Sequence, residues 1–371
     1  MALSTIPFSG LGADASNQGV NFRNLIINGD MSIAQRSTSV SSYGSVAYST
    51  VDRFKTVFEV GTYTVSQESL SSGEAYNNGF RKAFKALVTS TASPPSAGSQ
   101  TTFEQRIEGQ MCQAIKKGTS NAESLTLSFW VRSSKTGSNL QVNLRDTDNT
   151  RQVGGTYNIS SADTWEKKTI TFPPDTTGAL NNDNGISLTI EWWLDGGSNY
   201  SGGAVPTVWE ASSNADRNVT NFDLAGATND WWITGVQLEV GTSASDFEFL
   251  PYDVNLQRCY RYCQKNPQTS SGGDYKVIAS GFADSASLAM CSINPLSVEM
   301  RTVPSITSSG SFRVHKAGGA SSVSDVAIDS DTSGSTSFTI RCTTSSLTTG
   351  QGVFFEQSND DDAHVILDSE L

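Results

Sequence analysis

The sequence has little histidine, the side chain that most often acts as a general acid or base in catalysis. Its 371 residues include two histidines, His315 and His364, and neither lies in a G-x-S-x-G nucleophile motif. It also has no G-x-x-x-x-G-K-[ST], no H-E-x-x-H and no G-x-G-x-x-G after a predicted strand. Because His315 follows an alternating Phe-Arg-Val run, we expect it at a surface position of a strand. We predict a protein that is not an enzyme and that uses no cofactor.

Cysteine is scarce as well, and metal-binding patterns are missing. The five cysteines are an odd number without framework spacing, so we expect buried, reduced thiols. Cys259 and Cys263 stand four residues apart without a second pair or a nearby histidine, which argues against zinc. The acidic run 359–362 lacks the alternating ligands of an EF-hand loop, so we expect a solvated turn before the last strand. No metal site is predicted.

Positive charge and long apolar runs are also lacking. The formal net charge is −12 and the pI is about 4.7, so the surface should repel phosphate backbones and anionic lipids. No stretch approaches the roughly 18 apolar residues of a membrane span. The start, MALSTIPFSGLG, lacks the basic and apolar segments of a signal peptide, which predicts synthesis in a cytoplasm. We therefore expect neither a nucleic-acid partner nor membrane insertion, and a glycan partner should be neutral or reached through bridging divalent cations.

Alternation of apolar and polar residues dominates what is present. In LTLSFWVRS (125–133), every second residue from Leu125 to Val131 is apolar, which is the pattern of a half-buried antiparallel strand. We count roughly nine such stretches before residue 250, enough for a two-sheet jelly roll. The clearest others are 164–173, 186–194 and 232–240. The predicted fold class is all-β: a jelly-roll β-sandwich followed by a second, smaller β-sandwich, with an extended N-terminal arm.

A compositional step divides the chain. All seven tryptophans precede residue 240. Pro251 and the potential N-cap Asp253 then introduce apolar residues at helical spacing, which predicts a short helix or, alternatively, a strand entering the next domain. The N-terminal segment is a docking arm or a floppy tail. The predicted parts are a docking arm (1–22), a jelly-roll domain (23–252), a linker (253–265) and a C-terminal β-sandwich (266–371) with strands at 275–283, 287–294, 337–344 and 352–357.

Both ends of the first domain carry a family resemblance. NFRNLIINGDMSIAQR (21–36), the Val-Asp-Arg-Phe at 51–54 and ITGVQLEVGTSASDFEFLPYDVNLQRCYRYCQ (233–264) are similar to the phage tail-fibre and receptor-binding family whose N-terminal jelly roll resembles carbohydrate-binding modules. Met-Arg-Thr-Val-Pro (300–304) and the terminal Leu-Asp-Ser-Glu-Leu (367–371) fit it more loosely. The resemblance implies a virion location, a homotrimer and adhesion to a host glycan or other receptor. In a phage protein, the cytoplasm of synthesis expected above is that of the host, and we expect the arm to hold other virion proteins.

Strand parity predicts a polar and aromatic face. If the apolar residues of three strands point into the core, seven other side chains share the opposite face, provided that these strands lie in one sheet. Sugars stack on aromatic rings and pair with Arg, Glu and Gln, so this mixture suits a glycan groove. The alternatives are packing between subunits or under the loop 196–210, and a one-residue slip in register. The seven candidates are Trp130, Arg132, Glu191, Trp193, Trp231, Gln237 and Glu239.

Two other functions compete with adhesion. A capsid-attached head fibre or decoration protein could reuse the same module, and the partner of the arm would separate it from a tail fibre. A polysaccharide depolymerase would need paired carboxylates about 5–9 Å apart. Glu191 and Glu239 are the pair that parity places on one face near tryptophans.

Overall fold

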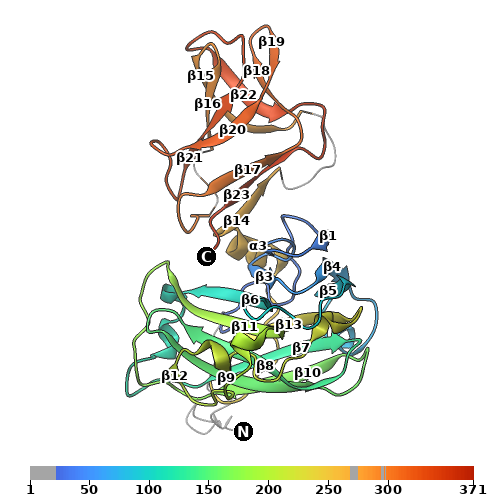
Figure 1. The fold of residues 1–371 in the computed structure, drawn as a ribbon. Helices are drawn as coiled ribbons and strands as arrows, with labels where there is room; N and C mark the ends of the chain where they lie inside the picture. The colour runs from blue at the N-terminus through green and yellow to red at the C-terminus, as the bar shows by residue number, and fades with distance from the viewer. Residues whose placement is uncertain (1–21, 268–274, 294–295, 297) are drawn as a thin grey trace, which may run out of the picture. The chain divides into compact units, whose positions relative to one another are not determined.

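A computed structural model describes residues 22–267, 275–293, 296 and 298–371 (Figure 1). Its elements are almost all strands, and the predicted all-β fold class is confirmed. Contacts divide the chain into two compact units, unit 1 ending at Tyr252 and also including Leu371, and unit 2 spanning Asp253–Glu370. Apart from Phe22, the predicted arm lies outside the described residues.

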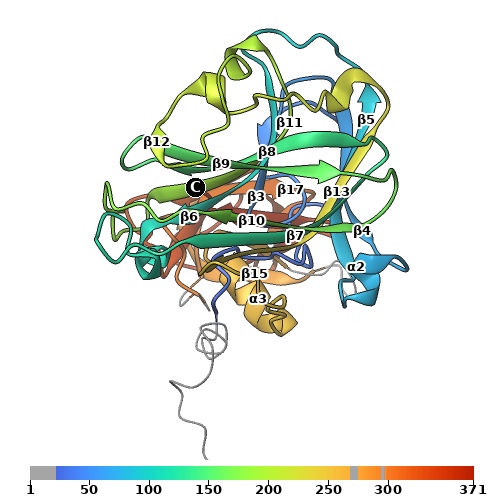
Figure 2. The same cartoon turned by 90° about the horizontal axis from the view of Figure 1, so that it is seen from below.

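Unit 1 is a sandwich of two antiparallel sheets, whose strands appear as two layers in Figure 2. The six-stranded sheet consists, in spatial order, of β1 (Ser39–Tyr43), β4 (Thr62–Ser69), β5 (Lys82–Ser90), β13 (Asp230–Val240), β7 (Leu125–Ser133) and β10 (Glu166–Phe172). The seven-stranded sheet consists of β12 (Glu210–Ala211), β9 (Arg151–Ile159), β8 (Gly137–Asp146), β11 (Ile186–Gly196), β6 (Gln100–Glu108), β3 (Phe54–Phe58) and β2 (Val46–Ala47).

The connections of unit 1 contain short helical turns. They are α2 (Glu74–Asn77) and the 3-10 turns Gly109–Met111, Gln113–Ile115, Ser198–Tyr200, Asn214–Asp216 and Leu224–Gly226.

Aromatic rings from both sheets fill the space between the layers of unit 1. Phe84 of β5 stacks on Phe103 of β6 with ring centroids 4.4 Å apart, and Phe129 of β7 meets Trp192 of β11 at 5.7 Å. Each of these side chains is fully buried. Burying one such ring stabilises the fold by at most about 4–6 kcal/mol, so the alternating apolar residues fix which side of each strand faces inward.

Strand β13 carries a β-bulge that reverses its alternation. Thr234 lies opposite Trp130 and Gln237 lies opposite Ser128, so β13 advances three residues while β7 advances two. Gly235, at the bulge, has a φ of +63°, a conformation that favours glycine. The inward side chains are therefore out of phase on the two sides of the bulge.

This change of phase corrects one predicted site residue. Trp231 was expected on the outer face, but its side chain is fully buried in the core, 5.7 Å from the ring of Phe103. Trp232, its neighbour, faces outward instead and contacts Lys85 and Arg132. The prediction assumed that the alternation seen after Gly235 also holds before it. The extra residue at the bulge reverses the alternation, so Trp231 points to the opposite side.

Helix α3 (Tyr252–Tyr260) lies, apart from its first residue, in unit 2 and in the segment predicted as a linker. Unit 2 has its own core around Phe312, Ile340 and Phe355. A three-stranded sheet holds β14 (Cys263–Asn266), β23 (His364–Asp368) and β17 (Ser305–Ser309). A seven-stranded sheet holds β19 (Gly319–Ser322), β18 (Phe312–Lys316), β22 (Gly352–Gln357), β15 (Val277–Ser285), β16 (Leu288–Ile293), β21 (Phe338–Thr343) and β20 (Asp325–Asp329).

Several residues that the sequence singled out now have positions. His315 is exposed on β18, and the acidic run 359–362 lies in the turn before β23. All five cysteines are buried. Within the described ranges, no helix has the length and apolar character to cross a membrane, and no three His, Cys, Asp or Glu side chains gather as a metal site.

Candidate functional site

The predicted outer face is divided between the two sheets. Strands β7 and β13 are neighbours in the six-stranded sheet, whereas β11 lies in the seven-stranded sheet. Glu191 and Trp193 therefore lie on the opposite side of the sandwich from Trp130, Arg132 and the outward residues of β13. The parity argument required one common sheet, and that condition is wrong, because alternation distinguishes core from surface but not one sheet from the other.

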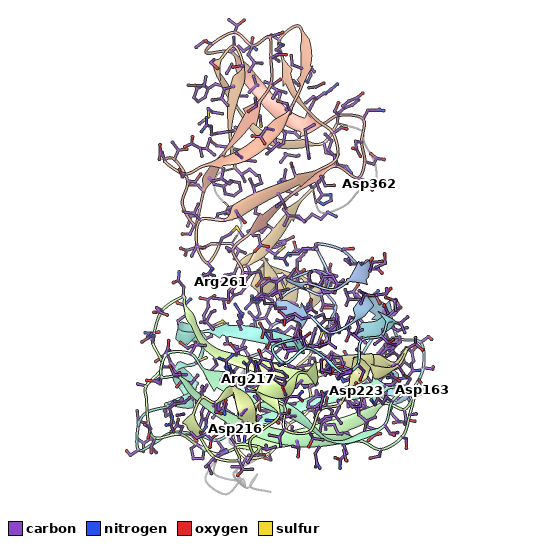
Figure 3. All side chains as sticks on the ribbon, viewed as in Figure 1. Asp163, Asp216, Arg217, Asp223, Arg261 and Asp362 are labelled. Carbon is purple, nitrogen blue, oxygen red and sulfur yellow. The ribbon has the colours of Figure 1, made fainter. Side chains whose placement is uncertain are left out.

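On β11, Trp193 is packed beneath loops. Its ring is fully buried, 4.9 Å from the ring of Tyr200 in the 196–210 loop, and its Nε1 donates to Glu191 at 3.2 Å. The guanidinium of Arg217, labelled in Figure 3, lies 4.9 Å from the same ring. Among the alternatives given above for the outward aromatic residues, Trp193 therefore fits packing under the loop 196–210.

The carboxylate of Glu191 is the centre of a buried ionic network. It accepts from Arg145 at 2.9 Å and from Arg217 at 2.9 and 3.0 Å. Burial acts to raise the pKa of Glu191, but the two guanidiniums outweigh it, so this pKa lies below its ordinary value. Glu104, directly opposite on β6, has a raised pKa, first because of burial and then because of the charge of Glu191.

The candidate depolymerase pair is separated by the same sheet assignment. Glu191 projects from the seven-stranded sheet and Glu239 from the six-stranded sheet, so the two carboxylates cannot flank one sugar bond. Glu191 is also only 1% exposed, which leaves no room for a substrate.

Gln237 and Glu239 do face outward from the six-stranded sheet, but they hold a protein segment. The side-chain carbonyl of Gln237 accepts from the backbone N–H of Glu248 at 2.8 Å. Glu239 accepts from the N–H of Ser245 at 2.9 Å and from its hydroxyl at 2.6 Å. Arg23 lies 3.5 Å from Glu239. These two residues therefore fix the segment 245–249 over the sheet.

The segment 245–249 forms one wall of a hollow beside the bulge. The bulge hollow has a volume of about 340 Å³ and is lined by residues from five parts of unit 1. Ser128 of β7 and Gly235 of β13 contribute at the bulge, and Lys167 of β10 lies directly opposite Trp130. The lining residues are Asn78, Phe80, Ser128, Trp130, Lys167, Gly235, Asp246, Phe247 and Phe249.

Glycine at the bulge keeps this hollow open. A Cβ at Gly235 would lie 2.6 Å from the ring of Phe80 and 3.0 Å from that of Trp130. The ring of Phe249 lies 5.0 Å from that of Phe80, tilted by 41°, and Phe249 is still 50% exposed. Trp130 is half-buried. The hollow thus presents partly exposed rings beside a lysine, an asparagine and an aspartate.

A cationic and aromatic strip continues along the same face. Arg132, two residues beyond Trp130 on β7, pairs with exposed Asp163 at 2.9 Å and lies 5.1 Å from the ring of Trp232. Lys85 lies 4.6 Å from that ring, and Trp165 meets it at 6.4 Å. Of the seven predicted residues, Trp130 alone lines the hollow and Arg132 flanks it.

Sequence reasoning missed most of the lining. Lys167 is the cross-strand partner of Trp130, which no local pattern reveals. Phe247 and Phe249 alternate with polar residues in the Asp-Phe-Glu-Phe stretch after the last strand, and that spacing was the available signal for a wall above the sheet. Asn78 and Phe80 come from the turn after α2.

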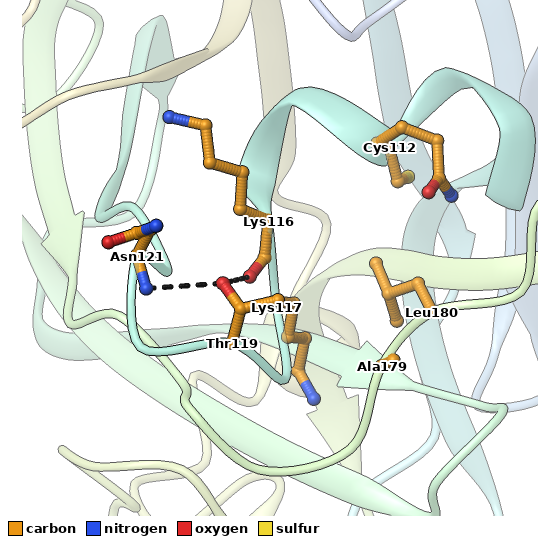
Figure 4. Close-up of a pocket in the computed structure, with 8 residues that line it drawn as sticks. Cys112, Lys116, Lys117, Thr119, Asn121, Ala179 and Leu180 are labelled. Carbon is orange, nitrogen blue, oxygen red and sulfur yellow. Dashed lines mark hydrogen bonds between the residues drawn. The ribbon is translucent and has the colours of Figure 1, made fainter.

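A second hollow in unit 1, of about 410 Å³, has a different character (Figure 4). It lies by the 3-10 turns after β6, and no aromatic ring lines it. The hydroxyl of Thr119 accepts there from the N–H of Asn121 at 3.1 Å. Its lining residues are Cys112, Gln113, Lys116, Lys117, Thr119, Asn121, Ala179 and Leu180. The bulge hollow, with its exposed rings, is the stronger candidate site.

No protein-family model matches the sequence, and a comparison with curated proteins finds no match either. Among solved structures, the enzymatically active domain of tailspike protein 4 from bacteriophage CBA120 is 13% identical with a TM-score of 0.30, over 59% of this chain and 21% of that one. The CBM22-1 xylan-binding domain of Paenibacillus barcinonensis Xyn10C is 11% identical with a TM-score of 0.28, and the match covers 56% of this chain and 94% of that domain. TmCBM61, solved with β-1,4-galactotriose, is 10% identical with a TM-score of 0.28, and the match covers 59% of this chain and 99% of that one.

Proposed function

We propose that unit 1 is a non-catalytic module that binds carbohydrate in the bulge hollow. The observation that carries this proposal is the half-buried Trp130 ring, set in an open hollow with the exposed Phe249 and the polar groups of Asn78, Lys167 and Asp246. A sugar ring has an apolar C–H face that stacks on an aromatic ring, and hydroxyls that donate and accept at its edge. The hollow offers both kinds of contact within the space of one or two sugar units.

We further propose that the chain is a homotrimeric tail fibre of a phage particle that adheres to a host surface glycan. The sequence resemblance at 21–36 and 233–264 supports this role. An open hollow of this size gives weak binding at one site, and weak sites suit a fibre because linking several raises avidity by about 10²–10⁴. Adhesion of this kind requires no catalytic residue.

Paired substitutions test the proposed sugar site. We expect Trp130→Ala and Phe249→Ala to weaken binding to the host polysaccharide about ten-fold each, since one lost stacking contact is worth about 1.4 kcal/mol. Phe282→Ala is the matched control, because Phe282 is 51% exposed in unit 2 and Phe249 is 50% exposed. Binding is measured by surface plasmon resonance on purified host polysaccharides, with thermal unfolding to confirm that each variant folds.

The proposal also predicts which variants leave binding unchanged. Phe282→Ala should bind as the native chain does. If Trp130→Ala and Phe249→Ala bind every polysaccharide of a neutral and acidic panel as tightly as the native chain, the bulge hollow is not the site. Equal losses in all three variants would point to a general effect on solubility or folding.

A further inference from the structure

One lysine of unit 1 is enclosed by oxygen atoms. The side chain of Lys117 is 1% exposed, and in Figure 4 it leaves the backbone away from that of Lys116. Its Nζ lies 2.5 Å from Asp146 Oδ2 and 2.9 Å from Asp175 Oδ2. The backbone carbonyls of Thr177 and Gly178 are each 2.9 Å away. An ammonium has three hydrogens to donate, yet four oxygens surround it. This arrangement resembles the oxygen ligands around a bound cation.

The oxygens of this cage are held in place by other groups. Asn149 donates to both oxygens of Asp146, at 2.9 Å each, through its backbone N–H and its side-chain amide. Arg151 binds both oxygens of Asp175, at 2.8 and 3.2 Å, and the N–H of Thr177 donates to Asp175 at 3.0 Å. The carboxylates are therefore oriented without the help of Lys117.

The charges of the cage are consistent with this geometry. Burial acts to raise the pKa of Asp175, but the hydrogen bonds from Arg151, Lys117 and Thr177 outweigh it and hold that pKa below its ordinary value. Two carboxylates thus face two cations, Lys117 and Arg151. The ring of Trp209, 5.0 Å from the ammonium, adds a cation–π contact.

Carboxylate and backbone carbonyl oxygens are the ligands of calcium, which takes six to eight oxygens at about 2.3–2.6 Å. We propose that this cage is a calcium-type cation site which the chain fills with its own Lys117 ammonium. The neighbouring hollow of about 410 Å³, which Lys117 also lines, would admit the water ligands that a metal ion needs once the lysine stem is removed. Native unit 1 thus fixes the 175–178 loop without drawing calcium from its surroundings.

The test replaces the internal cation with a free one. We expect Lys117→Ala to lower the unfolding temperature of unit 1 in calcium-free buffer, because two buried carboxylates lose a partner. Adding Ca²⁺ should restore most of the lost temperature, with a Kd of about 10⁻⁴–10⁻³ M, as in other low-affinity sites. Mg²⁺ should restore little, because it requires a tight octahedron at about 2.0–2.1 Å. Calorimetry with each ion measures both quantities.

Two further variants make the outcome decisive. Lys116→Ala, at the adjacent residue with a 52% exposed side chain, should show no calcium-dependent gain. Lys117→Ala combined with Asp146→Asn should lose the recovery by Ca²⁺. If Lys117→Ala does not fold in calcium-free buffer, the yield refolded with and without Ca²⁺ supplies the same reading. The proposal is wrong if Lys117→Ala gains nothing from Ca²⁺ in stability or in yield.

Discussion

At the scale of single residues, Glu104 and Glu191 show how burial and charge compete. The two face each other on β6 and β11, yet the pKa of Glu104 is raised by burial and by its neighbour, whereas the guanidiniums hold that of Glu191 down. A raised folded-state pKa means that stability is lost as pH rises through the ordinary value of 4.5 towards the folded one. For Glu191 the sign is opposite, and stability is lost as pH falls below 4.5.

This difference predicts opposite effects of two isosteric changes. Glu104→Gln should raise the unfolding temperature at neutral pH, and its advantage should shrink as the pH is lowered towards 4.5, where the native Glu104 takes up its proton. Glu191→Gln should destabilise unit 1 by about 3–5 kcal/mol, because Arg145 and Arg217 lose their buried counter-ion. Scanning calorimetry across this pH range measures both. A less stable Glu104→Gln at neutral pH would show that Arg106 and Lys55 outweigh the burial of Glu104.

The sequence predicts whether a side chain on a strand points into the core or outward, but it does not predict which residues cover that side chain. Phe129 points into the core and Trp130 outward, as the alternation in β7 indicates. Trp193 also points away from the core, but Tyr200 and Arg217 cover it. Those residues belong to loops whose paths depend on long-range contacts, so nothing in the sequence of β11 distinguishes a covered tryptophan from an accessible one.

At the scale of elements, the bulge of β13 shapes the hollow proposed as the sugar site. Its extra residue turns Trp231 inward and Trp232 outward, and it places a glycine where Phe80 and Trp130 approach. An isolated glycine within an alternating stretch is a recognised sign of a bulge. Gly235 therefore marked a possible bulge in the sequence. The alternation is regular on each side of Gly235, however, so only the pairing with β7 shows that the two sides are out of phase.

The bulge predicts a severe effect for the smallest side chain. Gly235→Ala should destabilise unit 1 by about 1–3 kcal/mol and weaken polysaccharide binding, because the methyl group meets Phe80 and Trp130. Gly350→Ala in unit 2 is the matched control, since Gly350 also has a positive φ, +83°, but its Cβ would meet nothing within 4 Å. Calorimetry and binding measure the two changes. An equal loss of stability in both variants would mean that backbone strain alone accounts for the effect.

At the scale of the whole molecule, sheet assignment is what sequence reasoning could not reach. The chain order of β5, β6 and β7 alternates between the two sheets of unit 1, and β13 returns to pair with β5 and β7 from far along the chain. Such pairings are chosen by the fit of the complete core. This is why an all-β fold could be predicted while the seven candidate residues could not be placed on one face.

Multivalency is the property of the whole molecule that the proposed adhesion requires. If three chains assemble, equilibrium sedimentation should give three times the 39.6 kDa of one chain. The same preparation should bind immobilised polysaccharide about 10²–10⁴ times more tightly than a soluble oligosaccharide of that polymer, because only the surface engages several hollows at once. Trp130→Ala should weaken both interactions and leave the mass unchanged. A mass of one chain, together with equal affinities for the polysaccharide and the oligosaccharide, would contradict multivalent adhesion by a homotrimer.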